Sequence, residues 1–356
     1  MNHSRRKPLL QGSCWRAVLV VVLLCGTVSL AQAVDLSGVP QIPWRPHVYE
    51  CLMAESPVIV DGDLSEPAWA NMAWTESFVD IRGGDHEKPR FKTQVKMTWD
   101  NDYFYVAAQL EEPNVWAKLT DRDAIIYYDN DFEVFLDPNG DTHEYYELEI
   151  NAFGTEWDLF LGKPYRDGGP ALHEWDIAGL KSAVKIQGTL NDPSDKDEGW
   201  TVEIAFPWSV LGSAARRDCP PKPGDTWRIN FSRVHWDTEV VGGEIVKQTG
   251  EDGKSLPEHN WVWSPQGLIN MHYPEMWGFV RFWEQPFMGR LAHPATIPEE
   301  EKKWRLRQAY YAFKYGGKIP EGVESLTTPK GFEAWIATEE AVWFIDETGR
   351  TTKKAP

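Results

Sequence analysis

The sequence lacks the short motifs that mark most catalytic and nucleotide-binding sites. It contains no G-x-S-x-G turn, no Walker loop, no H-E-x-x-H, no C-x-x-C-H and no dinucleotide-binding fingerprint. These absences argue against serine-hydrolase, nucleotide-binding, catalytic-zinc and covalent-haem chemistry. The 9 histidines are scattered without the spacing of metal ligands.

Positive charge is also scarce, because 36 Lys and Arg stand against 54 Asp and Glu, for a net charge of −18. Such a surface repels phosphates, so we expect neither nucleic acid nor an anionic membrane surface as a partner. After residue 33 no apolar run is long enough to cross a bilayer, so the protein is not expected to be membrane-embedded. Tryptophan is abundant instead, and the 19 indole rings serve as core filler or as platforms for sugar rings.

Residues 1–33 have the order of an export signal. Basic residues 5–7 precede an apolar run at 17–24, and the A-Q-A sequence at 31–33 is typical of a cleavage site. The two arginines resemble a twin-arginine signal, but Pro8 occupies the usual aromatic position, so Sec and twin-arginine export both stay open. We therefore expect an exported protein, periplasmic or extracellular.

Cleavage of the signal removes two of the four cysteines and leaves Cys51 and Cys219. In an oxidising compartment these two are expected to form a disulfide. Two unpaired thiols remain the alternative, because the sequence does not show whether the side chains meet.

The rest of the chain reads as an all-β fold. About a dozen short alternating segments, separated by turn signals, favour a two-sheet antiparallel β-sandwich of jelly-roll type over alternating β and α units. We predict the sandwich at 57–283, after an extended lead-in at 34–56. Residues 284–356 are predicted to form a small α+β appendage, with a charged helix from 298 to 314.

The most informative stretch is an acidic and aromatic one, residues 127–161, which is predicted to form a β-hairpin. In its first run, apolar side chains such as Phe132 and Val134 alternate with Asp131 and Glu133. The apolar residues are expected to face the core, and the acidic ones the opposite side of the sheet.

A turn at residues 139–140 would place Glu133 opposite Glu147 and Asp131 opposite Glu149. Like charges directly across a strand pair are destabilising. The arrangement therefore predicts a cation, a raised pKa or the hydroxyl groups of a ligand at this place. A solvated acidic face of the sheet is the alternative.

Two acidic loops are candidates for calcium, since hard oxygen ligands at alternate positions suit that ion. The first loop offers Asp137, Asn139 and Asp141, and the second offers Asp195 and Asp197. Neither has the spacing of an EF-hand, and turn residues without a metal are the alternative for each loop.

Five segments taken in order resemble the family 9 carbohydrate-binding modules. They are residues 60–63 (VDGD), 99–106 (WDNDYFYV), 131–137 (DFEVFLD), 199–208 (GWTVEIAFPW) and 277–279 (WGF). The resemblance implies a β-sandwich with bound calcium that grips a sugar, often at the reducing end of a chain, between two aromatic rings. It also implies an association with xylan degradation, although no catalytic domain accompanies the segments here.

The resemblance also suggests individual roles. Glu133 stands where the family has its sugar-binding glutamate, and Tyr127 stands at the first ring, normally a tryptophan. Glu149 replaces the family's arginine on the next strand. The place that aligns directly with the second ring holds Met271 or His272, so the ring is expected from Trp261 or Trp263, and His272 is also expected to bind the ligand.

The interpretation favoured by the sequence is non-catalytic binding of a plant-type polysaccharide such as xylan or glucan. Tyr127 and Trp263 would stack on the sugar, and Glu133 would accept its hydroxyls, supported by Glu147 and Glu149. The first alternative is a glycoside hydrolase that uses Glu133 and Glu147 as its carboxylate pair. The second is a haem-binding sandwich with Met and His ligands.

We predict that the mature protein begins at Val34, because the A-Q-A sequence ends at residue 33. N-terminal sequencing of the exported protein checks this start. A mature chain that keeps the apolar run 17–24 would contradict the prediction.

Overall fold

The computed structural model describes residues 37–286 and 292–356. The predicted signal peptide lies outside these residues. Within the described ranges, no helix has both the length and the apolar character needed to cross a membrane.

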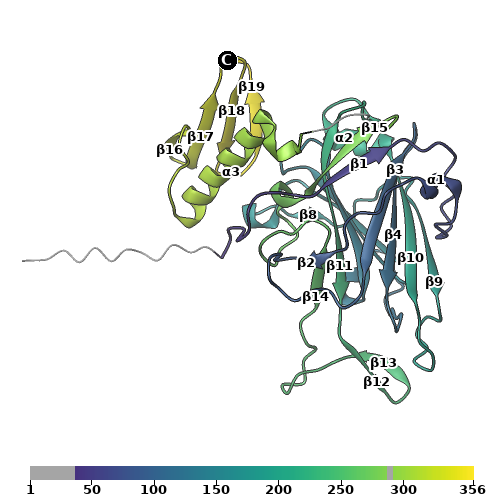
Figure 1. Ribbon diagram of the computed structural model, residues 1–356. Coiled ribbons are helices and arrows are strands. Elements are labelled where there is room, and N and C mark those ends of the chain that lie inside the picture. Colours follow the sequence, from purple (N-terminus) through teal and green to yellow (C-terminus); the bar gives the residue numbers. More distant parts are fainter. Residues whose placement is uncertain (1–36, 287–291) are drawn as a thin grey trace, which may run out of the picture. The chain divides into compact units, whose positions relative to one another are not determined.

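Nine strands form the larger of two stacked sheets (Figure 1). The main path runs β1-β15-β11-β5-β6-β7-β8, and β14 pairs with both β11 and β2. The strands are β1 (Val48–Leu52), β2 (Val79–Asp80), β5 (Asp131–Asp137), β6 (Tyr145–Asn151), β7 (Glu156–Leu161), β8 (Ala171–Leu172), β11 (Thr226–His235), β14 (His259–Val262) and β15 (Gly278–Trp283).

The smaller sheet has four strands in the order β3-β4-β10-β9. They are β3 (Thr93–Trp99), β4 (Tyr103–Glu111), β9 (Lys181–Gln187) and β10 (Gly199–Pro207). A separate hairpin of β12 (Thr238–Val241) and β13 (Glu244–Lys247) extends from the end of β11.

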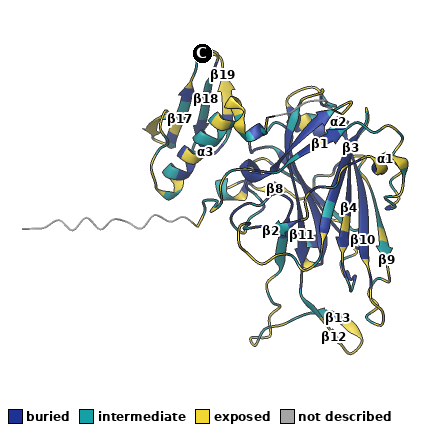
Figure 2. Cartoon of the chain, viewed as in Figure 1, coloured by how far each residue is buried: buried dark blue, intermediate teal, exposed yellow. Residues whose placement is uncertain are grey.

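The main core lies between the two sheets, as the alternation predicted. Phe132 and Val134 of β5 and Val202 and Ile204 of β10 belong to one buried apolar cluster. Figure 2 shows the strands of the sandwich as mostly buried. Burying alternate apolar side chains from both sheets removes apolar area from water at about 25 cal/mol per Å². The chain is therefore the all-β sandwich that the sequence predicted.

Strand β1, helix α2 (Trp208–Ala215) and the β12–β13 hairpin were not anticipated from the sequence. Strand β1 belongs to the predicted lead-in, and it pairs in parallel with β15, whereas the other paired strands of the described chain are antiparallel. Helix α2 follows β10 directly, and its Trp208 and Leu211 are buried in the main core. The short helix α1 (Pro67–Ala70) buries Trp69 completely.

The C-terminal residues form an α+β appendage, as predicted. Helix α3 (Pro298–Tyr315) packs on a four-stranded sheet of β16 (Glu324–Thr328), β17 (Gly331–Ala337), β18 (Val342–Asp346) and β19 (Thr351–Lys354). Leu306 and Tyr310 of the helix share a buried cluster with Tyr273 and Met276, which precede β15. Apolar contacts therefore join the appendage to the segment before β15.

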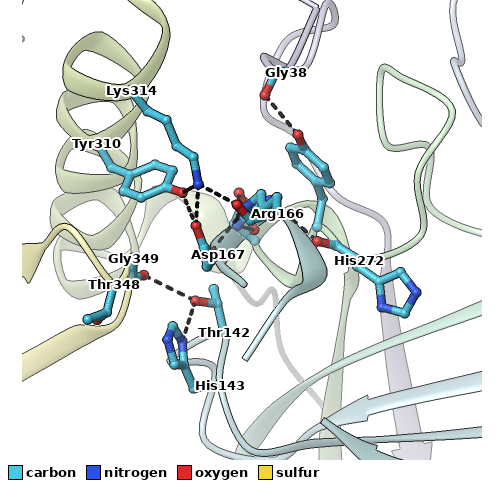
Figure 3. A network of polar contacts seen from close by, with 12 residues as sticks. Gly38, Thr142, His143, Arg166, Asp167, His272, Tyr310, Lys314, Thr348 and Gly349 are labelled. Carbon is cyan, nitrogen blue, oxygen red and sulfur yellow. Dashed lines mark hydrogen bonds and ion pairs between the residues drawn. The ribbon is translucent and has the colours of Figure 1, made fainter. Parts of the chain in front are cut away.

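Buried charges also join the appendage to the sandwich. Arg166 forms an ion pair of 2.9 Å with Glu275, and Arg307 of α3 lies 3.6 Å from the same carboxylate. The Tyr311 hydroxyl donates to Glu275 as well. Burial alone would raise the pKa of Glu275, but Arg166 and Arg307 outweigh it and lower the pKa to about 2. In the same region Tyr310 and Lys314 of α3 reach Asp167 (Figure 3).

The predicted disulfide between Cys51 and Cys219 is contradicted, since both are free thiols in the structure. Cys51 lies on β1, where it is fully buried and paired with Phe282 of β15. Cys219 instead lies against Gly212 of α2. Each side chain is thus packed among its own neighbours.

We predict that Glu275→Gln lowers the free energy of unfolding by about 3 kcal/mol at pH 7, because it removes the buried charge that Arg166 and Arg307 share. The folded pKa lies below the unfolded value, so this contribution is present above pH 4.5 and is lost as the pH falls towards 2. Urea unfolding from pH 7 to pH 3 measures it. Asp218→Asn, in an exposed pair with Lys222, is the control and should change stability little. Equal effects of the two variants would contradict the prediction.

Candidate functional site

The hairpin β5–β6 has a different register from the one predicted. Glu133 lies opposite Glu149, and Asp131 lies opposite Asn151. The turn is longer than expected because the Asp137 carboxylate accepts from the amides of Gly140 and Thr142 and holds a wider loop. A shift of two residues keeps each side chain on its predicted face. The acidic residues therefore still gather on the face turned away from the sandwich core.

A cleft of about 550 Å³ opens over that outer face of the larger sheet. This volume is within the range of small-molecule sites, about 300–1,000 Å³. Polar side chains line its floor, and aromatic and aliphatic ones form much of its wall. Its lining comprises Ile81, Ile125, Tyr127, Glu133, Phe135, Glu147, Glu149, Trp157, Tyr165, His173, Val234, Glu258, Asn260, Ile269, Asn270, Met271 and His272.

Four carboxylates gather at the floor. Glu133, Glu147 and Glu149 line the cleft, and Asp131 lies beside them with no exposed surface. Oxygen atoms of Asp131, Glu133 and Glu149 all lie within 4.8 Å of one another. Burial raises the pKa of Glu133 to about 7, and burial with the neighbouring acids raises the pKa values of Asp131, Glu147 and Glu149 well above normal. The floor therefore holds proton acceptors that an incoming hydroxyl or cation would stabilise in their charged form.

Tyr127, the predicted first ring, lines the cleft beside this floor. It belongs to the 3₁₀ turn η1 (Ile126–Tyr128), and its backbone amide donates to Glu149 over 2.9 Å. Its carbonyl accepts from the indole of Trp236. These two bonds fix the backbone of Tyr127, while its half-buried ring lines the cleft.

The predicted second ring is wrong in both of its versions. Trp261 and Trp263 belong to the main core and are 3% and 0% exposed. Trp261 stacks on His235, and the indole of Trp263 donates to Glu76. Because side chains alternate along this segment, Asn260 faces the cleft while the two tryptophans face inwards.

His272, which the sequence placed near the ligand, lines the cleft. Its Nδ1 shares a hydrogen bond of 2.8 Å with the Tyr145 hydroxyl, and its ring meets that of Tyr165 edge-on at 4.4 Å. Burial and the charge of Arg166 lower the pKa of His272 to about 3, so the imidazole is neutral at pH 7.

Sequence reasoning missed much of the cleft wall. Tyr165 is 43% exposed, Ile125 41% and Ile269 64%, and all three line the cleft. Trp157 also lines it and stacks on His173. Tyr165 and Ile269 come from loops far apart in the sequence, so no local pattern marks them.

The two predicted calcium loops lie apart from the cleft lining. Asp137 and Asn139 accept backbone amides of their own loop, and Asp141 pairs with Arg350. In the second loop, Asp197 accepts the amides of Val115 and Thr189, and Asp195 accepts the Thr189 hydroxyl. Protein donors thus already occupy these oxygens, and calcium in either loop stays a prediction.

Comparison with known proteins identifies the sandwich. Residues 60–237, half of the chain, match the family described as carbohydrate family 9 binding domain-like. The chain belongs to this family. The match includes Tyr127 and all four carboxylates of the floor, whereas Met271, His272 and the appendage of this family 9 protein lie outside it.

Two curated relatives share a shorter segment with this family 9 protein. Exoglucanase XynX of Acetivibrio thermocellus is 28% identical over 117 residues, which are 33% of this chain and 9% of that protein. Endo-1,4-beta-xylanase A of Thermoanaerobacterium saccharolyticum is 29% identical over 117 residues, 33% of this chain and 8% of that one. The chain therefore spans under a tenth of the length of these relatives.

Solved structures show weaker likenesses. A family 9 module from Caldicellulosiruptor kristjanssonii, in complex with cellotriose, has 13% identity and a TM-score of 0.42 over 69% of this chain and 98% of its own. A putative carbohydrate-binding protein from Bacteroides uniformis has 16% identity and a TM-score of 0.47 over 67% and 99%. With both scores below 0.5, the family assignment rests on the match of residues 60–237.

We predict that His272 makes the family 9 protein less stable in mild acid. The unfolded histidine has a pKa near 6.5, whereas the folded one is about 3, so the unfolded chain binds more protons between these values. Lowering the pH from 7 to 5 should therefore cost the wild type about 2 kcal/mol more than His272→Gln. Urea unfolding of both proteins at the two pH values measures this difference. Parallel losses of stability would contradict a neutral buried imidazole.

Proposed function

We propose that this family 9 protein binds carbohydrate without cleaving it, and that one end of a polysaccharide chain enters the cleft over β5 and β6. The observation that carries the proposal is the pairing of an aromatic and aliphatic wall with a floor of carboxylates. A sugar ring has the matching chemistry, since its C–H faces are apolar and its edge carries hydroxyl donors.

The wall supplies the apolar part of recognition. Tyr127 and Tyr165 offer ring faces, and Trp157 adds a third aromatic side chain. Aromatic side chains bury large areas and hold a ligand in a defined orientation. In this proposal Tyr165 takes the place that Trp263 was expected to fill.

The floor supplies the polar part. Glu133 lines the cleft with only 5% of its surface exposed, so a hydroxyl that reaches it leaves water behind. A hydrogen bond to a charged acceptor in such a place contributes about 1.5–3 kcal/mol. Glu147 and Glu149 extend the row of acceptors along β6.

A plant-type polysaccharide such as xylan or glucan is the polymer we favour, because the two curated relatives are an exoglucanase and a xylanase by name. We also propose a location outside the cytoplasm, because residues 1–33 have the order of an export signal and such a location suits a polymeric ligand. Haem binding stays an untested alternative, and Soret absorbance of the purified protein is its direct test.

Substitution of Glu133 and Tyr127 tests binding against hydrolysis. We expect Glu133→Gln to weaken binding of xylo- or cello-oligosaccharides by roughly 1.5–3 kcal/mol in calorimetric titration, since it loses a charged acceptor. Tyr127→Ala should also weaken binding because it removes the ring. The wild type should release no reducing sugar in the same samples.

Two matched controls lie away from the cleft. Glu340, exposed after β17, controls for the change of Glu to Gln, and the exposed Phe153 controls for the loss of a ring. Neither control variant should alter affinity. The opposite outcome has two parts: the wild type releases reducing sugar, and Glu133→Gln abolishes this release without changing affinity. That result would contradict non-catalytic binding and support glycoside hydrolysis through a carboxylate pair.

A further inference from the structure

Among the described residues the acidic floor of the cleft has little compensation for its charge, because Arg233 interacts with Asp131 but forms its ion pair with Glu112. In the described part of the chain, the charged groups that most affect Asp131, Glu133, Glu147 and Glu149 are other acids. Burying several carboxylates together is unfavourable unless protons or a cation neutralise them.

Two buried carboxylate oxygen atoms indicate where a ligand would bind. In the described part of the chain, Oδ2 of Asp131 and Oε2 of Glu147 are buried and have no hydrogen-bond partner. Both side chains are almost fully buried, with 0% and 5% of their surface exposed. By contrast, Oδ1 of Asp131 accepts from the Val234 amide, and Glu149 accepts from the Tyr127 amide. Backbone donors thus hold the carboxylates in place and leave other oxygen atoms free.

The spacing fits a cation. Calcium binds oxygen at about 2.3–2.6 Å, so two of its ligands lie at most about 5 Å apart. The oxygen atoms of Asp131, Glu133 and Glu149 are all within 4.8 Å of one another. Three carboxylates suit a hard divalent ion, and the irregular set of donors suits calcium better than the strict octahedron of magnesium.

We propose that Asp131, Glu133 and Glu149 bind a calcium ion at the floor of the cleft, and that this ion contacts the hydroxyl groups of the bound sugar. The contact between the ion and the sugar rests on the proposed function, whereas the calcium site itself does not. Calcium takes six to eight ligands, so three carboxylates leave coordination positions for water or for two neighbouring hydroxyls. Glu147 lies beside the ion and accepts a hydrogen bond from one of those groups.

Asp131 gives the sharpest test, because it is fully buried and does not line the cleft. Asp131→Asn removes a charged calcium ligand without touching the sugar. After chelator treatment, calorimetric titration of the wild type with calcium chloride should show binding at this site. Asp131→Asn and Glu149→Gln should each weaken it at least tenfold, and Glu340→Gln should leave it unchanged.

The melting temperature gives a second measurement, and the proposal predicts the direction of its change. Calcium should raise the melting temperature of the wild type by mass action and should not raise that of Asp131→Asn. Without calcium, Asp131→Asn should melt at or above the wild-type temperature, because it removes an acid whose charged form burial and the neighbouring carboxylates disfavour. Asp195→Asn tests the alternative calcium site in the loop that holds Asp195 and Asp197. If Asp195→Asn loses calcium binding and Asp131→Asn keeps it, the proposal is overturned.

Sugar titrations separate this inference from the proposed function. Oligosaccharide binding that needs calcium and fails after chelation supports both. Sugar binding that is equally tight in chelator overturns the role of the ion and leaves carbohydrate binding intact. Calcium binding at Asp131 without any oligosaccharide binding supports the ion site and overturns the proposed function. A wild type that binds no calcium overturns the ion site, whether or not the variants fold.

Discussion

Strands β5 and β6 are buried on both faces, and this double burial governs the chemistry of the site. Their inner faces fill the space between the sheets with residues such as Phe132 and Leu148. Their outer faces place Glu133 and Glu149 side by side beneath a wall built by loops. A solvated row of acids would have ordinary pKa values and little reason to prefer a ligand. Removing the same row from water is what makes it receptive to hydroxyls or to a cation.

Much of the sandwich could be predicted because each strand has a local sequence pattern of alternating apolar and polar residues. The alternation of apolar and polar residues predicted where β5 and β6 lie and which of their side chains face the core. The predicted turn was too short, which gave the wrong pairing between the strands but left each side chain on its predicted face. Strand β1 was hidden because its parallel partner β15 comes more than two hundred residues later. Parallel pairing leaves no hairpin turn in the sequence. Helix α2 was hidden because it continues directly from β10 and is short.

The site was only half predictable, for a related reason. Tyr127 and Glu133 lie close together in the sequence as well as in space, so one motif carried both. Trp263 was chosen for its aromatic ring, but the alternation along its own segment turns that ring into the core. Tyr165 could not be found from any local pattern, since only the tertiary fold brings its loop against His272.

The segment Tyr165–Asp167, which follows β7, contacts both the cleft and the appendage. Tyr165 lines the cleft, while the next two residues, Arg166 and Asp167, bind Glu275, Tyr310 and Lys314. The side of this segment that faces the ligand is therefore covalently tied to the side that holds helix α3. Energetic coupling between two sites is reciprocal. If the appendage stabilises the position in which Tyr165 contacts a sugar, binding of the sugar also stabilises the packing of the appendage. In the proposed binding mode, residues 298–315 would therefore contribute to sugar affinity although none of them lines the cleft.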